Sequence, residues 1–226
     1  MTRIPVDARK VAVVLIGIGV ALGIAHFAVA NRDVFGATLL DLNAERGFGT
    51  AFASLQGALC AGLAMTVAVS ARQHGRSRVW WLLLALGMAL YSIDEVAQVH
   101  EAVASQLRGV RTEGTNPRGG MAVIALVALP VFAVAAWGVL RVAHRRAGWL
   151  IASGLAVFWL AGFGIEEVEF RGVSGMLGWF DHMTPLEAIF VLAGIQETFE
   201  MLGVSLIAWG ILRQLADDES VVFDIT

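Results

Sequence analysis

The chain has 226 residues, of which 58% are hydrophobic and only 15% are charged, and its formal net charge is −3. A soluble domain typically has about 45–50% apolar and about 25% charged residues, so this chain is too apolar for a water-soluble domain. The small net charge and the lack of a Lys/Arg run exclude a nucleic-acid-binding protein. A single cysteine, Cys60, excludes an intramolecular disulfide framework and a CxxC zinc or redox site.

Six apolar stretches are long enough to cross a bilayer. A transmembrane helix needs about 20 mostly apolar residues, and a backbone in lipid must satisfy its own hydrogen bonds, which favours helices. The stretches cover approximately residues 11–30, 48–71, 79–101, 121–141, 149–170 and 186–212. We therefore expect an all-α fold, with residues 1–226 forming one polytopic transmembrane helix bundle of six spans.

The first stretch has a second interpretation. Arg3, Arg9 and Lys10 precede it, and it ends in Ala28-Val29-Ala30, which resembles a signal-peptidase site. The apolar region of a signal peptide usually has about 7–15 residues, and this stretch is longer. We therefore expect a retained helix, whereas cleavage would leave five spans.

The distribution of basic residues predicts the orientation. Ten of the 16 Lys and Arg residues flank the two termini and the second-to-third and fourth-to-fifth loops, against six in the opposite loops. Cytoplasmic loops carry the excess of Lys and Arg, and tryptophan gathers at membrane interfaces. The tryptophans at these same ends are Trp80, Trp81, Trp137, Trp149 and Trp209. We expect both termini in the cytoplasm and the protein in the bacterial cytoplasmic (inner) membrane.

Three local signals predict details of the helices. Gly19 and Gly23 form a small-xxx-small pair that permits close helix packing. Pro130 is expected to kink the fourth helix. The segment Thr184-Pro185-Leu186-Glu187 has the pattern of a capping box with proline at the first helical position, so the sixth helix should begin there.

Ionisable residues lie inside the apolar stretches, where they are costly, so each is a candidate functional residue. They are Asp94, Glu95, His100 and Glu101 in the third stretch, Glu166, Glu167 and Glu169 in the fifth, and Glu197 and Glu200 in the sixth. At about 100° per residue, Asp94 and Glu101 share one helix face. Glu166 and Glu169 are one turn apart, as are Glu197 and Glu200. Glu95 and Glu167 flank the shared faces and are expected at the rim or paired with Arg46 and Arg171.

Depth distinguishes the last pair from the others. Glu197 and Glu200 should lie about 16 Å and about 21 Å below the start of the sixth helix, and no Lys or Arg lies at that depth in any stretch. Both are either protonated and hydrogen-bonded or part of a functional site. Glu101, Glu169 and Glu187 are near helix ends, where solvation at the interface is a sufficient explanation.

The leading hypothesis is a divalent metal site that opens toward the outer side. Hard carboxylate oxygens with one imidazole suit iron or manganese better than structural zinc or copper(I). The expected metal-site residues are Asp94, His100, Glu101, Glu166, Glu169, Glu197 and Glu200. Di-iron carboxylate bundles use an ExxH motif, whereas this chain has ExxE, and neither redox chemistry nor metal transport is specified. No nucleophile–base set with defined spacing is visible, so an enzymatic activity is left undecided.

Three alternatives stay open. Chains of intramembrane Glu and Asp also serve as proton relays, so the acids fit proton or cation translocation without a bound metal. An accessory subunit of a larger membrane complex, or a homo-oligomer, would instead pair the acids with basic residues of a partner. A bis-histidine haem would need His26 and His100, but His26 fits a packed, hydrogen-bonded histidine better.

Two segments carry a resemblance to a known group. The first is Tyr91-Ser92-Ile93-Asp94-Glu95-Val96-Ala97-Gln98-Val99-His100-Glu101, and the second is Glu197-Thr198-Phe199-Glu200-Met201-Leu202-Gly203. With the acidic stretch Asp41-Leu42-Asn43-Ala44-Glu45, they resemble a family of small multi-span bacterial membrane proteins over roughly residues 41–212. The resemblance implies a shared architecture and shared acidic positions, but no particular reaction.

Overall fold

The computed structural model describes residues 7–29, 37–40, 42, 47–73, 75, 77–97, 120–165 and 184–217, and these ranges contain helices and no strands. In chain order the elements are α1 (Ala8–Val29), α2 (Ala37–Leu40), α3 (Phe48–Gln73), α4 (Val79–Ala97), α6 (Gly120–Val142), α7 (Arg145–Trp159), the π-helix η2 (Leu160–Ile165) and α9 (Pro185–Asp217). The all-helical fold class is therefore confirmed for the described part of the chain.

Within the described ranges, five helical segments are long and apolar enough to cross a membrane: α1, α3, α4, α7 continued by η2, and α9. In α6, the apolar segment whose side chains are described is shorter and covers Leu129–Val142. The helix contains Pro130 and continues past it. The fifth span begins at Arg145 rather than near residue 149, because the basic residues before Trp149 are also helical. Large apolar side chains lie on the outside, with Leu55 69% and Val96 71% exposed. These features are compatible with a multi-pass protein in a lipid bilayer.

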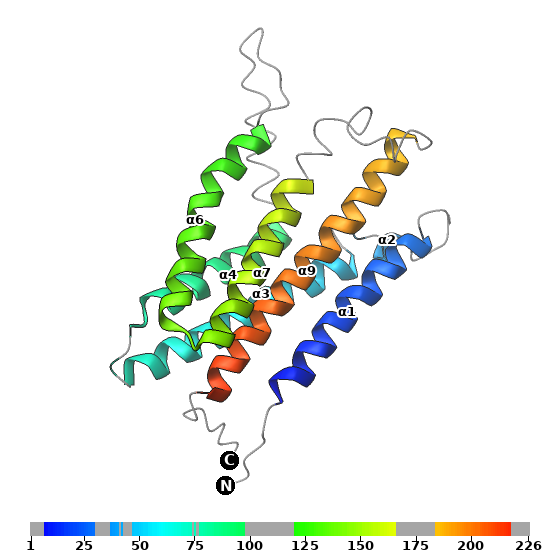
Figure 1. Cartoon of the computed structure of the whole chain (residues 1–226). Helices are drawn as coiled ribbons and strands as arrows, with labels where there is room; N and C mark the ends of the chain where they lie inside the picture. Colours follow the sequence, from blue (N-terminus) through cyan, green and yellow to red (C-terminus); the bar gives the residue numbers. More distant parts are fainter. Residues whose placement is uncertain are drawn as a thin grey trace.

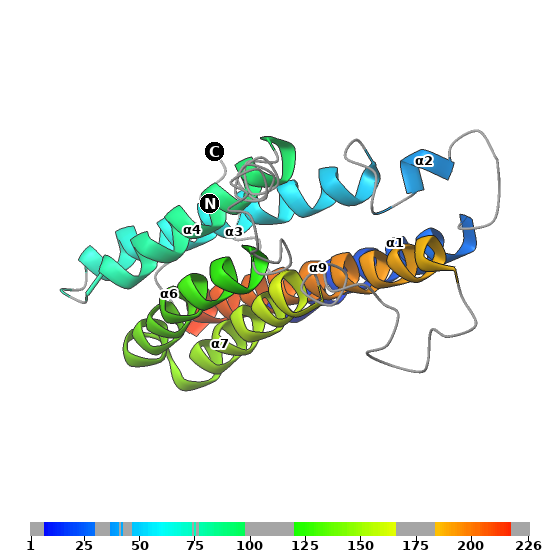
Figure 2. The same ribbon diagram turned by 90° about the horizontal axis from the view of Figure 1, so that it is seen from above.

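The helices form two layers. Helices α6, α7, α9 and α1 lie side by side in one layer, and the α3–α4 hairpin covers it from the other side (Figures 1 and 2). Helix α9 is the central element, since it packs against α7, α1, α3 and η2. Its 33 residues span about 50 Å at 1.5 Å per residue. The start of α1, the end of α9 and the α6–α7 turn lie at the same end of the bundle (Figure 1).

Helices α7 and α9 touch through their backbones along a seam of glycines. A Cβ atom on Gly154 of α7 would lie 2.6 Å from the carbonyl oxygen of Gly203, and one on Gly203 of α9 would lie 2.8 Å from the amide nitrogen of Phe158. One on Gly210 would lie 2.5 Å from the side chain of Ile151. These contacts set the antiparallel register, since residues later in α7 meet residues earlier in α9. Small residues at helix crossings permit this close approach in membranes.

Two of the local predictions are confirmed by contacts of α9: the close packing at Gly19 and Gly23, and the capping box. A Cβ on Gly19 would lie 3.4 Å from the Cβ of Met201, and Gly23 faces the side chain of Thr198, so this glycine pair packs α1 against α9. At the start of α9 the Thr184 N–H donates to Oε2 of Glu187 over 2.8 Å, and the Glu187 N–H donates back to Oγ1 of Thr184 over 3.3 Å. This reciprocal pair is the capping box.

Buried hydrogen bonds tie the two layers together. Gln56 Nε2 of α3 donates to Oγ of Ser205 of α9 over 2.8 Å. Within the α3–α4 hairpin, Ser54 Oγ donates to the carbonyl oxygen of Ser92 over 2.9 Å, and Ser92 Oγ donates to that of Ser54 over 2.8 Å. The apolar core around them includes Trp81, whose side chain is fully buried. Polar side chains that bond across helices hold spans together in lipid.

His26 joins three separate segments at the opposite end from the α6–α7 turn. Its ring is 0% exposed. The Leu42 N–H donates to Nδ1 over 3.0 Å, and Nε2 lies 3.1 Å from the carbonyl oxygen of Phe190. These partners assign the neutral tautomer with the proton on Nε2. The imidazole also stacks on the ring of Phe190, and Gly194 leaves room for it, since a Cβ there would collide with the imidazole.

The glycine seam predicts opposite effects for two Gly→Ala substitutions. Gly203→Ala should lower the free energy of unfolding by about 1–3 kcal/mol because its new methyl group meets backbone atoms that cannot move aside. Gly62→Ala on α3, where no atom lies within 4 Å of the added Cβ, should raise stability through better helix propensity. Thermal unfolding of the detergent-purified variants measures both signs. Equal shifts in the two variants would contradict the backbone contact.

The His26 bridge predicts a stability loss in His26→Ala. The substitution leaves the buried Leu42 N–H without its acceptor, which costs about 1–3 kcal/mol, and it adds a cavity. His144→Ala is the matched control because that imidazole is exposed and makes no capping hydrogen bond to α7. Chemical denaturation of both variants in the same detergent compares them. A loss of the same size in both would show that His26 does not join these segments.

Candidate functional site: a buried carboxylate cluster

Three of the seven expected site residues lie on described helices: Asp94 on α4, and Glu197 and Glu200 on α9. The other four lie outside the described residues: His100, Glu101, Glu166 and Glu169. The first two follow α4 within four residues of its end at Ala97, and the last two follow η2 within four residues of its end at Ile165. The described part of the site therefore consists of the ends of α4 and η2 and the middle of α9.

Glu200 is the deepest acidic residue of the cluster. Its side chain is only 7% exposed, and Gln196 Nε2 donates to its Oε1 over 3.1 Å. The same oxygen faces η2, where a Cβ on Gly162 would lie 3.1 Å from it. The carboxylate is therefore packed against the π-helix backbone, and the glycine makes the space that it occupies.

The π-helix lies where this contact is made. Helix α7 changes to wider π turns at Leu160 and keeps them to Ile165. Single π turns inside α-helices are uncommon and frequently mark functional sites. The indole Nε1 of Trp159, at the junction, is buried and has no hydrogen-bond partner among the described residues. The junction between α7 and η2 thus places Gly162 against Glu200. It also contains the buried N–H donor of Trp159.

Tyr91 of α4 lies in electrostatic range of three carboxylates. Glu95, Glu197 and Glu200 all act electrostatically on its phenol, and Glu95 is also in side-chain contact with it. The Tyr91 hydroxyl is buried, and no described atom is placed to form a hydrogen bond with it. The Glu95 side chain therefore lies near the hydroxyl without the geometry of a hydrogen bond. Its ring packs edge to face on Phe158, with 4.9 Å between centroids. Tyr91 therefore links α4 to α7 through its ring, and its hydroxyl is in electrostatic range of carboxylates on α4 and α9.

The expected pairing of Glu95 with Arg46 or Arg171 stays a prediction, since both arginines lie outside the described residues. Glu95 is half-buried one turn after Tyr91 and acts on the same phenol as Glu197 and Glu200. Its spacing could have shown this, because it continues the buried stripe of Trp81, Ala85 and Met88 at steps of three, four and seven residues. Asp94 is half-buried and is not among the described carboxylates that act on Tyr91. The sequence reasoning also passed over Tyr91 and Gln196, which are polar but not charged.

The described residues alone do not form a metal site. Among them, no three His, Cys, Asp or Glu side chains are placed to hold a metal ion. A metal would thus need donors from residues 98–101 or 166–169 in addition to those of α4 and α9. His26 is not a candidate ligand, because backbone groups engage both of its ring nitrogens.

Comparison with known proteins gives a family and no function. No curated protein and no solved structure matches the chain. A family model described as Domain of unknown function (DUF8692) matches residues 9–213, which include every carboxylate of the cluster and all or most of each described helix. With most of its length matched by that model, the chain belongs to the DUF8692 family.

Proposed function

We propose that this protein binds a cation at a carboxylate site within its membrane-spanning bundle. The observation that carries the proposal is the burial of the Glu200 carboxylate against Gly162 of η2, with Glu95 and Glu197 in electrostatic range of the same Tyr91 hydroxyl. The Lys and Arg residues of the described helices all lie within the first or last five residues of a helix, whereas Glu200 lies in the middle of α9. A carboxylate buried in a membrane-spanning bundle is costly and is a candidate functional residue, and carboxylate oxygens are suited to binding a cation.

The leading candidate is a divalent metal ion, with iron or manganese favoured. Carboxylate oxygens are the preferred ligands of hard cations, and one imidazole suits iron and manganese. Glu197 and Glu200 supply oxygens from α9 and Asp94 from α4. The remaining donors of the proposed set are His100, Glu101, Glu166 and Glu169. Their positions directly after α4 and η2 favour this arrangement, because both elements reach the cluster.

The second candidate is a proton, which needs fewer ligands than a metal. Gln196 already donates to one oxygen of Glu200, and the described residues hold no three-ligand group. Chains of intramembrane carboxylates are common parts of proton pathways. On this hypothesis, protons pass between Glu95, Glu197 and Glu200, and the Tyr91 hydroxyl is a further hydrogen-bonding group of the path.

The proposed setting follows the charge distribution. With both termini in the cytoplasm, as the excess of Lys and Arg predicts, the cluster lies in the outer half of a bacterial cytoplasmic membrane protein. Six spans need α6 as a sixth crossing, in addition to the five helical segments that qualify by length and hydropathy. Access from the outer side would suit uptake or sensing of a cation.

Metal content tests the leading candidate. Detergent-purified wild-type protein should carry a near-stoichiometric divalent metal by mass spectrometry, and Glu197→Gln/Glu200→Gln should lose it. Glu187→Gln is the matched control, because Gln also completes a capping box and the residue lies at the exposed start of α9. A wild-type protein without metal after supplementation with Fe²⁺ and Mn²⁺ would contradict the metal hypothesis.

Infrared spectroscopy tests the second candidate on the same samples. If metal-free wild-type protein holds a proton at the cluster, it should show the carbonyl stretch of a protonated carboxyl group, with a shift in D₂O. The band should disappear in Glu200→Gln and persist in Glu187→Gln. If neither metal nor this band is found, the cation site is wrong and the carboxylates await the basic residues of a partner subunit.

A further inference from the structure

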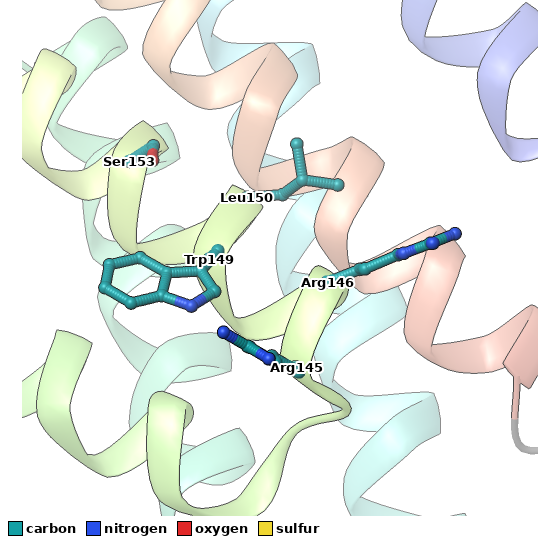
Figure 3. Close-up of a pocket in the computed structure, with 5 residues that line it drawn as sticks. All are labelled: Arg145, Arg146, Trp149, Leu150 and Ser153. Atoms are coloured by element: carbon teal, nitrogen blue, oxygen red, sulfur yellow. The ribbon is translucent and has the colours of Figure 1, made fainter.

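A cavity of about 530 Å³ opens on the surface at the start of α7 (Figure 3). Its lining residues are Arg145, Arg146, Trp149, Leu150 and Ser153. They all belong to the first turns of α7 and share one face of it. Arg145 and Trp149 lie on one side of the cavity, and Arg146 and Leu150 lie on the other. The cavity is at the opposite end of the bundle from the His26 bridge (Figure 1).

The two arginines of the cavity carry uncompensated charge within the described part of the chain. Two other arginines at this end already have partners. The Arg141 guanidinium lies 4.8 Å from the ring centroid of Trp137, and Arg213 Nε lies 3.2 Å from Oδ1 of Asp217. No carboxylate lines the cavity, and no described carboxylate pairs with Arg145 or Arg146. The chemistry of the cavity therefore favours an anion.

The backbone at this position adds to the positive potential. His144 occupies the N-cap position of α7, but its side chain makes no capping hydrogen bond. Its own N–H is used elsewhere, donating to Oε1 of Gln214 over 2.8 Å. The first N–H groups of a helix lack partners inside the helix and attract anions, phosphate groups above all.

Apart from Ser153, the rest of the lining is formed by Trp149 and Leu150, which points to an amphiphile rather than a free ion. Trp149 is 58% exposed and lies one turn into the apolar segment Arg145–Ile165, which is long enough to cross a membrane. Leu150 and Ser153 continue the same face further along the segment. A bound molecule would thus meet guanidinium groups at the membrane surface and an indole and an aliphatic side chain below them.

We propose that this cavity binds an anionic phospholipid, with its phosphate between Arg145 and Arg146 and its acyl chains along Trp149 and Leu150. Basic pockets at one side of a transmembrane bundle are suited to anionic headgroups, and the bidentate guanidinium group matches phosphate geometry. The proposal is independent of the carboxylate cluster, because Glu200 lies against Gly162 of η2, beyond the end of α7 that is opposite the cavity.

The experiment compares two charge-matched double variants of the full chain in a neutral detergent. Arg145→Gln/Arg146→Gln removes the proposed phosphate contacts, whereas Arg72→Gln/Arg78→Gln removes two charges flanking the α3–α4 turn, outside the cavity. Binding of fluorescent phosphatidylglycerol and phosphatidylcholine is titrated for each protein, and thermal unfolding confirms that each is folded. We expect phosphatidylglycerol to bind about thirtyfold more weakly to the cavity variant and unchanged to the control.

Three results would overturn the proposal. Equal losses in the two double variants would show that the overall positive charge, rather than the cavity, attracts the lipid. Equal binding of phosphatidylcholine to wild type would show that the anionic headgroup is not recognised. Glycerol phosphate that competes as strongly as the lipid would show a site for soluble phosphates instead.

Discussion

The backbone contact between α7 and α9 is the constraint on which the rest of the structure depends. At Gly154 and Gly203 the two helices approach so closely that a single methyl group would meet backbone atoms on the other side. Because backbone atoms cannot rotate away as side chains do, this contact allows one register only. Every residue further along α7 then has a set partner on α9, and Gly162 lies against Glu200. The seam thus places an acidic side chain beside the π-helix.

The other polar ties keep the remaining helices on this pair. Gln56 bonds to Ser205, one helical turn below Met201, and His26 connects α1 and Leu42 to α9 through two backbone groups. In lipid the hydrophobic effect does not draw helices together, so close packing and hydrogen bonds of this kind supply the attraction. The Gln56 and His26 hydrogen bonds both involve residues of α9, which is consistent with the position of α9 at the centre of the bundle. The α3–α4 hairpin is held on itself by the reciprocal bonds of Ser54 and Ser92.

The interior of the bundle and the α6–α7 turn have opposite electrostatic character. Carboxylates act on Tyr91 within the bundle, whereas the α6–α7 turn carries arginines at the surface. Charge inside a low-dielectric region needs a partner at close range, since the cost of burial is large. Charge at a membrane surface needs only an interfacial counter-charge, which lipid headgroups supply. A cation at the cluster and an anionic lipid at the turn would therefore each supply a counter-charge, one inside the bundle and one at the membrane surface.

Much of the fold could be predicted from local patterns. Apolar length predicts the helices, the Thr184–Glu187 pattern predicts the start of α9, and the spacing of Gly19 and Gly23 predicts a close crossing. Each depends on neighbours in the chain, whose geometry a helix repeats every 3.6 residues. The depth of Glu197 and Glu200 on α9 follows from the same rise per residue.

The composition of the cluster was decided by packing between helices. Periodicity shows which residues share a face, but it does not show that Glu95 rather than Asp94 acts on the Tyr91 phenol together with the acids of α9. The contact of Gly154 with Gly203, and that of Gly162 with Glu200, likewise join segments distant in the chain. Hence the sequence determines the helices and the depth of their acids, whereas the tertiary structure decides which side chains face one another, because that depends on the relative rotation of separate helices.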